Sequence, residues 1–137
     1  YLVSQGFEVD ALDISSVAIS QLQNIPSINA KEVDFDTYTL SRAQYELIIC
    51  TYFLERKIFP QMIEALKPGG IILMETFLHD PKNERKASNP AFLLDKGELK
   101  AAFGDTCELI HIPEFWDTDY KCFKTMKTSM VARKRAT

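Results

Sequence analysis

Short apolar runs alternate with helix-like patterns along most of this chain. The run Leu47-Ile48-Ile49-Cys50 is apolar on both faces, as expected for a central strand of a parallel sheet. Such alternation is typical of βαβ units. The apolar runs predict strands at 7–14, 29–33, 45–51 and 71–77, and the stripes of period 3.6 predict helices at 17–25 and 58–66.

Residues with special backbone preferences separate these segments. Gly6 closes a helix end at 1–5, and Ser15 or Ser16 is a suitable N-cap for the helix that follows the first strand. Pro60 falls in the first turn of the second helix, where its missing N–H is harmless. The segment Lys67-Pro-Gly-Gly70 is expected to end that helix and turn the chain.

The last third of the chain is less regular. Residues 79–90 form a polar, proline-containing segment and are expected to be a surface loop, and Asp95 with Glu98 resembles a capping box. Strands are predicted at 106–112 and 122–132, joined by a connection at 113–119. We therefore expect an α/β fold, with residues 1–137 forming a single, partial domain.

Composition narrows the classes of function. A net charge of −3 provides no basic surface for nucleic acid, and no apolar run approaches the roughly 20 residues that span a bilayer. The start of the chain lacks the features of a signal peptide. Cys50, Cys107 and Cys122 are scattered without metal-ligand spacing, which favours reduced thiols in the cytoplasm and predicts no metal site.

Acidic residues follow the first two predicted strands. Ligands of parallel α/β sheets bind beyond the carboxyl ends of the strands, where Asp13 and Asp34 lie 21 residues apart. A carboxylate at Asp13 can accept both hydroxyls of a ribose, and one at Asp34 can accept from an adenine amino group. Either aspartate could instead be a helix cap or a loop residue.

These features together resemble a known family. The segments 8–13 (EVDALD), 32–36 (EVDFD), 45–50 (YELIIC) and 66–73 (LKPGGIIL) look like those of class I S-adenosylmethionine-dependent methyltransferases. The segments 74–77 (METF) and 89–99 (NPAFLLDKGEL) resemble the branch that includes tellurite-resistance-type methyltransferases. The resemblance covers the chain from residue 1 to about residue 134.

The resemblance implies a fold and a set of site residues. The fold would be a Rossmann-like methyltransferase sandwich, with a mostly parallel sheet and an antiparallel last strand. The implied cofactor is S-adenosyl-L-methionine. Asp13 would bind its ribose, Ile14 would pack on the adenine, Asp34 and Phe35 would address the adenine edge, Cys50 would lie beside the methionine portion, and Tyr52 would lie near the site of methyl transfer.

One departure from the family concerns the start of the chain. The first strand and the glycine-rich loop of such domains have no counterpart before Gly6, which corresponds to roughly 30 to 50 residues. That loop normally lets the backbone approach the methionine end of the cofactor. If the 137 residues exist alone, we expect an exposed sheet edge and self-association, giving a homo-oligomer.

Methyl transfer requires few catalytic side chains, because the sulfonium is already reactive and placement is the main task. Tyr52 and His79 are the candidate catalytic residues, with Glu75 as a further candidate and Arg56 as a possible contact to an anionic acceptor. His79 could instead be an exposed loop histidine, and Arg56 could be a solvated charge at a helix start. The loop 81–94 is a candidate substrate lid.

The function predicted from the sequence is S-adenosylmethionine-dependent methyl transfer to a small-molecule acceptor. A second hypothesis is a non-catalytic, truncated methyltransferase-like module that acts in self-association or partner binding. A third is a NAD-dependent oxidoreductase, because Asp13 would suit the ribose of NAD equally well.

Overall fold

The computed structural model describes residues 1–85, 89–119 and 121–136. The chain divides into two compact units, Tyr1–Thr39 and Leu40–Thr137. Each unit is described by itself below. Within the described residues, no helix is long and apolar enough to cross a membrane.

The first unit is a parallel pair of strands with one short helix. Ser15 caps the helix by accepting the N–H of Ala18, as the sequence predicts. The helix ends at Ser20, earlier than predicted, and left-handed residues follow at Asn24 and Ser27, with φ of 65° and 68°. The elements are η1 (Val3–Gln5), β1 (Val9–Asp13), α1 (Ser16–Ser20) and β2 (Ile28–Glu32).

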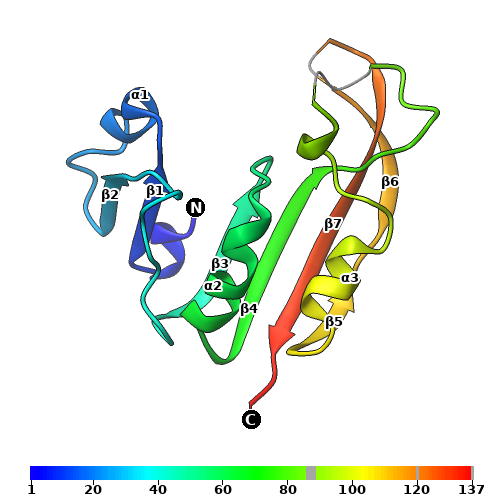
Figure 1. Ribbon diagram of the computed structural model, residues 1–137. Coiled ribbons are helices and arrows are strands. Elements are labelled where there is room, and N and C mark those ends of the chain that lie inside the picture. The colour runs from blue at the N-terminus through cyan, green and yellow to red at the C-terminus, as the bar shows by residue number, and fades with distance from the viewer. Residues whose placement is uncertain (86–88, 120, 137) are drawn as a thin grey trace. The chain divides into compact units, whose positions relative to one another are not determined.

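The second unit is a five-stranded sheet with two helices (Figure 1). Its strand order is β3-β4-β7-β5, and β6 also pairs with β7. The elements are β3 (Tyr45–Thr51), η2 (Arg56–Ile58), α2 (Phe59–Ala65), β4 (Leu66–Phe77), η3 (Pro90–Phe92), α3 (Glu98–Phe103), β5 (Cys107–His111), β6 (Glu114–Thr118) and β7 (Lys124–Lys134).

The last strand of the sheet is antiparallel, as the resemblance implies, and the other four strands of the second unit share one direction. β3 and β4 run parallel, but β7 is antiparallel to β4, β5 and β6. The connection at 113–119 was expected to lie outside the sheet and instead contains β6. The physical reason is the length of β7, whose residues 124–128 pair with β6 while residues 131–134 pair with β5.

The segment 67–70 ends α2 as predicted, but it lies within β4, which begins at Leu66. The pairing of β3 with β4 is irregular there, since Tyr45 pairs with Leu66 whereas Leu47 pairs with Ile71. Gly69 has φ +81°, and a Cβ on Gly70 would lie 2.9 Å from the carbonyl oxygen of Lys67. The two glycines therefore accommodate a bulge at the start of β4.

Helices α2 and α3 cover one face of the sheet in the second unit (Figure 1). The rings of Phe59 and Phe103 join the two helices, with centroids 5.2 Å apart. The pairs Ile72↔Ala132 and Met74↔Met130 are buried on β4 and β7. Because side chains alternate along a strand, the odd-numbered residues of β4 and β7 lie on the opposite face.

Candidate functional site

Asp13 and Asp34 lie at the carboxyl ends of neighbouring parallel strands in the first unit. Asp13 is the last residue of β1 and pairs with Glu32, the last residue of β2, and Asp34 follows two residues later. The N–H of Val33 donates to the carbonyl of Asp13 at 2.8 Å, which continues the pairing beyond β2. The juxtaposition predicted from their spacing is therefore present.

Both carboxylates also organise their own loops. Oδ1 of Asp13 accepts the N–H of Ser15, and Oδ1 of Asp34 accepts the N–H of Asp36, each at 2.9 Å. Both side chains are exposed, and Oδ2 of each has no hydrogen bond to any described residue. Each aspartate can therefore shape its turn and still present one oxygen to a ligand.

The two apolar residues beside these aspartates differ in exposure. Ile14 is 65% exposed, which leaves its side chain available to pack on a ligand. Phe35 is half-buried and packs edge-on against Tyr38, with ring centroids 6.3 Å apart. Phe35 thus has a packing role within its own unit.

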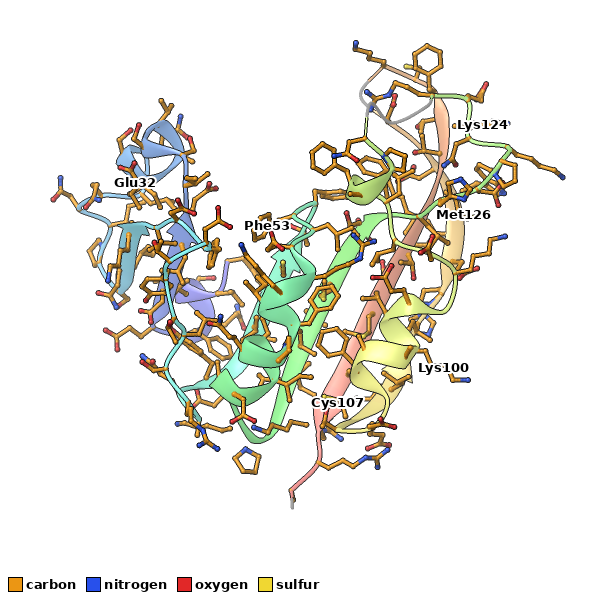
Figure 2. All side chains as sticks on the ribbon, in the orientation of Figure 1. Glu32, Phe53, Lys100, Cys107, Lys124 and Met126 are labelled. Carbon is orange, nitrogen blue, oxygen red and sulfur yellow. The ribbon has the colours of Figure 1, made fainter. Side chains whose placement is uncertain are left out.

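Cys50 lies near the end of β3, opposite Met74 of β4. Its thiol donates to the carbonyl of Phe53 at 3.6 Å. Figure 2 labels Phe53 just beyond the end of β3. Burial raises the pKa of the Cys50 thiol, so this side chain is a neutral group at the strand end rather than a thiolate.

Tyr52 follows β3 in a left-handed conformation, with φ 54°. Such a φ is uncommon for a residue with a large side chain and requires support from its surroundings. The Tyr52 N–H donates to the carbonyl of Glu75 at 2.7 Å, and its hydroxyl donates to the Glu75 carboxylate. Its ring packs on Phe77, with centroids 5.4 Å apart.

Three further side chains complete this arrangement, which we call the Tyr52 cluster (Tyr52, Glu75, Asp117, Lys127 and Ser129). Lys127 donates to the Tyr52 hydroxyl at 3.1 Å and to Oδ2 of Asp117 at 3.0 Å. Ser129 donates to Oε1 of Glu75 at 2.6 Å. Ser129 is directly opposite Glu75, and Lys127 is opposite both Phe77 and Phe115. The register thus brings four strand ends together on one face of the sheet.

The cluster shifts the ionisation of its members. Hydrogen bonds from Ser129 and Tyr52 lower the pKa of Glu75, and the hydrogen bond from Lys127 lowers that of Asp117. Burial, followed by the bond to Glu75, raises the pKa of Tyr52. The pKa of Lys127 is raised because its bonds to Tyr52 and Asp117 outweigh the opposing effect of burial. At neutral pH the cluster holds two carboxylates, one ammonium and one neutral phenol.

The other predicted site residues lie apart from these hydrogen bonds. His79 is exposed, and its backbone N–H donates to the carbonyl of Leu94 at 2.8 Å. Arg56 is bound to Glu98 and donates to the carbonyls of Ala91 and Leu93, each at 2.8 Å. Arg56 therefore holds protein groups together, and its contact with an anionic acceptor stays a prediction. The predicted lid at 81–94 includes residues 86–88, which lie outside the described residues.

Sequence reasoning missed the roles of Lys127, Ser129 and Asp117. Lys127 lies within a strand that the sequence predicts, next to Met126, yet this position does not reveal its partners. Figure 2 labels Met126, the residue before Lys127 in the sequence. Asp117 belongs to the strand β6 that was not predicted.

Two other features of the described residues lie outside the candidate site. A depression of about 460 Å³ is lined by residues of α3 and β5 and by Arg135, near Cys107 and thus at the opposite end of β7 from Lys127. No group of three or more His, Cys, Asp or Glu side chains among the residues described could hold a metal ion.

Comparison with solved structures shows a methyltransferase-like α/β fold. TehB from Haemophilus influenzae matches with a TM-score of 0.76 at 23% identity, covering 95% of this chain and 51% of that protein. An S-adenosylmethionine-dependent methyltransferase from Methanosarcina mazei matches with a TM-score of 0.69 at 16% identity, covering 99% and 86%. A further one from Mesorhizobium loti matches with a TM-score of 0.66 at 16% identity, covering 91% and 79%.

The chain thus spans about half the length of the Haemophilus TehB. No protein with a curated description matches the sequence. The family model for the tellurite resistance protein TehB matches residues 1–117. Because this match extends over most of the 137 residues, the chain belongs to the TehB family.

Proposed function

We propose that this chain binds S-adenosyl-L-methionine and takes part in methyl transfer to a small-molecule acceptor. The observation that carries the proposal is the pair Asp13 and Asp34 at adjacent strand ends, in a chain of the TehB family. The S-adenosylmethionine-dependent methyltransferases from Methanosarcina mazei and Mesorhizobium loti have a similar fold, which supports the assignment.

In this proposal the first unit binds the adenosine portion. The free oxygen of Asp13 accepts the ribose hydroxyls, and that of Asp34 accepts the adenine amino group. Ile14 packs against the adenine, because its exposed side chain gains from being removed from water. Phe35 packs near the adenine edge. These residues fit the adenosine half of the cofactor by their chemistry.

The remaining proposed roles concern the reacting end of the cofactor. Cys50 contacts the methionine portion as a neutral thiol, and Tyr52 contacts the acceptor. The bound cofactor supplies an activated methyl group, so the protein has mainly to orient the nucleophile and accommodate its proton. His79 remains a second candidate for accepting that proton, as an exposed residue that follows β4.

Calorimetric titration with S-adenosylhomocysteine tests the proposal. We expect saturable binding to the unmodified chain and at least a tenfold loss of affinity in Asp13→Asn. Asparagine retains the oxygen that caps the turn at Ser15, so the fold should persist while the charge is lost. Glu32→Gln is the matched control, because Glu32 pairs with Asp13 and is exposed on the neighbouring strand.

Three results would contradict the assignment. Equal binding by wild type and Asp13→Asn would remove the ribose role of that residue. Absence of binding at submillimolar S-adenosylhomocysteine, combined with saturable binding of NADH, would favour an oxidoreductase. If neither ligand binds and light scattering shows a defined oligomer, a non-catalytic module is favoured. In that case the role of Asp13 and Asp34 would be to form the hydrogen bonds that shape their own loops.

A further inference from the structure

The hydrogen bonds of the Tyr52 cluster have a fixed direction. An ammonium can only donate, so Lys127 donates to Oη of Tyr52, and the phenol proton must then go to the Glu75 carboxylate. Oη has two lone pairs and one of them accepts from Lys127. The other is available, and Tyr52 is 47% exposed. The cluster therefore offers an incoming molecule an acceptor atom that is connected to a carboxylate.

The surroundings of Lys127 add a second observation. Its side chain is only 9% exposed, and its ammonium lies 5.0 Å and 5.5 Å from the ring centres of Tyr52 and Phe77. Thr125 is on the same face of β7, two residues away, and its buried Oγ1 has no hydrogen-bond partner among the described residues. Buried hydroxyls are seldom left without a partner, and a bound ligand can supply one.

Resting on the methyltransferase function proposed above, we propose that Tyr52, Glu75 and Lys127 form a proton relay for an acceptor that carries a hydrogen on its nucleophilic atom, such as a neutral thiol or hydroxyl. Oη of Tyr52 receives the acceptor's proton. The phenol proton passes at the same time to Oε2 of Glu75, and Lys127 stabilises the negative charge that develops on Oη. Glu75 later releases its proton to water.

The overall step is balanced. As the methyl group leaves sulfur for the acceptor atom X, the S–CH₃ bond breaks, the X–CH₃ bond forms and the X–H proton enters the relay. Attack makes X positively charged and therefore strongly acidic, so a carboxylate of lowered pKa is a sufficient base. Before the step Glu75 is ionised and Tyr52 is neutral, and afterwards Glu75 is neutral and Tyr52 has regained a proton.

The charges of the cluster indicate which acceptors it disfavours. Glu75, Asp117 and Lys127 together carry a net charge of −1, with both carboxylates within one or two hydrogen bonds of Oη. Like charges at such distances repel, and the partly buried setting screens them less than water would. The nucleophilic tellurium of an oxyanion such as tellurite also carries no hydrogen for the relay to remove. The relay therefore suits a neutral acceptor better than an oxyanion.

Transfer of the methyl group from S-adenosylmethionine to 2-mercaptoethanol, measured in parallel with transfer to tellurite, tests this inference. We expect the unmodified chain to prefer the thiol, with a rate nearly independent of pH around neutrality. Tyr52→Phe should lower the rate at neutral pH about 100-fold. Its remaining rate should rise with pH, because the reaction then depends on thiolate formed in solution. Tyr1→Phe is the matched control, since Tyr1 is 94% exposed.

A measurement without turnover examines the same chain of bonds. The difference in tyrosinate absorbance between the unmodified protein and Tyr52→Phe isolates the titration of Tyr52. Glu75→Gln should move that titration to lower pH, and Lys127→Met should move it to higher pH, because the carboxylate opposes and the ammonium favours the phenolate. If neither substitution moves it, the bonds are not in series and the relay is excluded.

Calorimetry with S-adenosylhomocysteine separates failure of the relay from failure of the proposed function. Wild type and Tyr52→Phe should bind it equally. If S-adenosylhomocysteine binds but the pH profile of Tyr52→Phe is the same as that of the unmodified chain, the relay alone is overturned. The relay alone is also overturned if S-adenosylhomocysteine binds and methyl transfer occurs only to tellurite or to neither acceptor. Loss of S-adenosylhomocysteine binding by the unmodified chain overturns the methyltransferase function itself.

Discussion

The ammonium of Lys127 lies 3.1 Å from the hydroxyl of Tyr52 and 5.0 Å from the centre of its ring. The Lys127 side chain thus makes both a hydrogen bond and a cation–π contact with Tyr52. This contact joins the end of β3 to β7, although the two strands are not neighbours in the sheet. It depends on the left-handed backbone at Tyr52, which directs that side chain across β4.

Lys127→Met should destabilise the second unit by about 2 kcal/mol, because it leaves the Tyr52 oxygen and Asp117 without their shared donor. The methionine side chain keeps the volume, so packing contributes little to the loss. Urea denaturation followed by circular dichroism measures the effect. Lys124→Met, at an exposed position on the same strand, should change stability by less than about 0.5 kcal/mol. Equal effects would mean that the contacts of Lys127 are energetically neutral.

Arg56→Ala should cost about 3 kcal/mol, because the guanidinium makes bidentate contacts with Glu98 and holds two backbone carbonyls. Removing it also loosens the segment 89–98 from η2. Arg42→Ala is the control, since Arg42 pairs with Glu64 in a surface ion pair with its side chain 83% exposed and should contribute about 0.5 kcal/mol. Chemical denaturation of both variants measures the two losses of stability. If Arg56→Ala loses no more stability than Arg42→Ala, the contacts of Arg56 do not stabilise the fold.

The pair Arg56 and Glu98 also predicts a pH dependence. The hydrogen bond from Arg56 lowers the pKa of Glu98 in the folded protein, so the folded state binds this proton less tightly than the unfolded state. The resulting stability is present above the unfolded value of about 4.3 and is lost as pH falls through the folded value. Glu98→Gln should therefore show a smaller loss of stability than wild type between about pH 5 and pH 3. Glu108→Gln, exposed on β5, should follow wild type in the same denaturation series.

The bulge at the start of β4 gives a comparison between adjacent glycines. Gly70→Ala should destabilise the protein by about 3 kcal/mol, because the new Cβ would meet backbone oxygens of Lys67 and Tyr45 at 2.9 Å and 3.2 Å. In Gly69→Ala the new Cβ would meet no atom within 4 Å. This substitution should therefore cost only the strain of φ +81°, about 1 kcal/mol. Thermal denaturation of the two variants ranks them, and the reverse order would show that conformational strain exceeds steric crowding here.

Much of the local structure follows from the sequence. β3 occupies the predicted residues 45–51, because an apolar run with no helical period favours a strand. Its predicted central position is not found in the second unit, where β3 is the first strand in the order β3-β4-β7-β5 and Ile49 is 47% exposed. Ser15 and Pro60 begin their helices as predicted, since capping and proline geometry depend on neighbours along the chain. β6 was missed because it is short, exposed and stabilised by pairing with β7, a relationship that no local pattern encodes.

The candidate site divides in the same way. The sequence by itself determined the positions of Asp13 and Asp34, because two parallel strands bring their carboxyl ends to one edge whenever they pair in register. Only the tertiary structure decided that Lys127 and Asp117 would join Tyr52 and Glu75, because these four residues come from different strands. Their proximity depends on the register of β4 and β6 against β7, and register is set by the packing of the whole sheet rather than by the residues themselves.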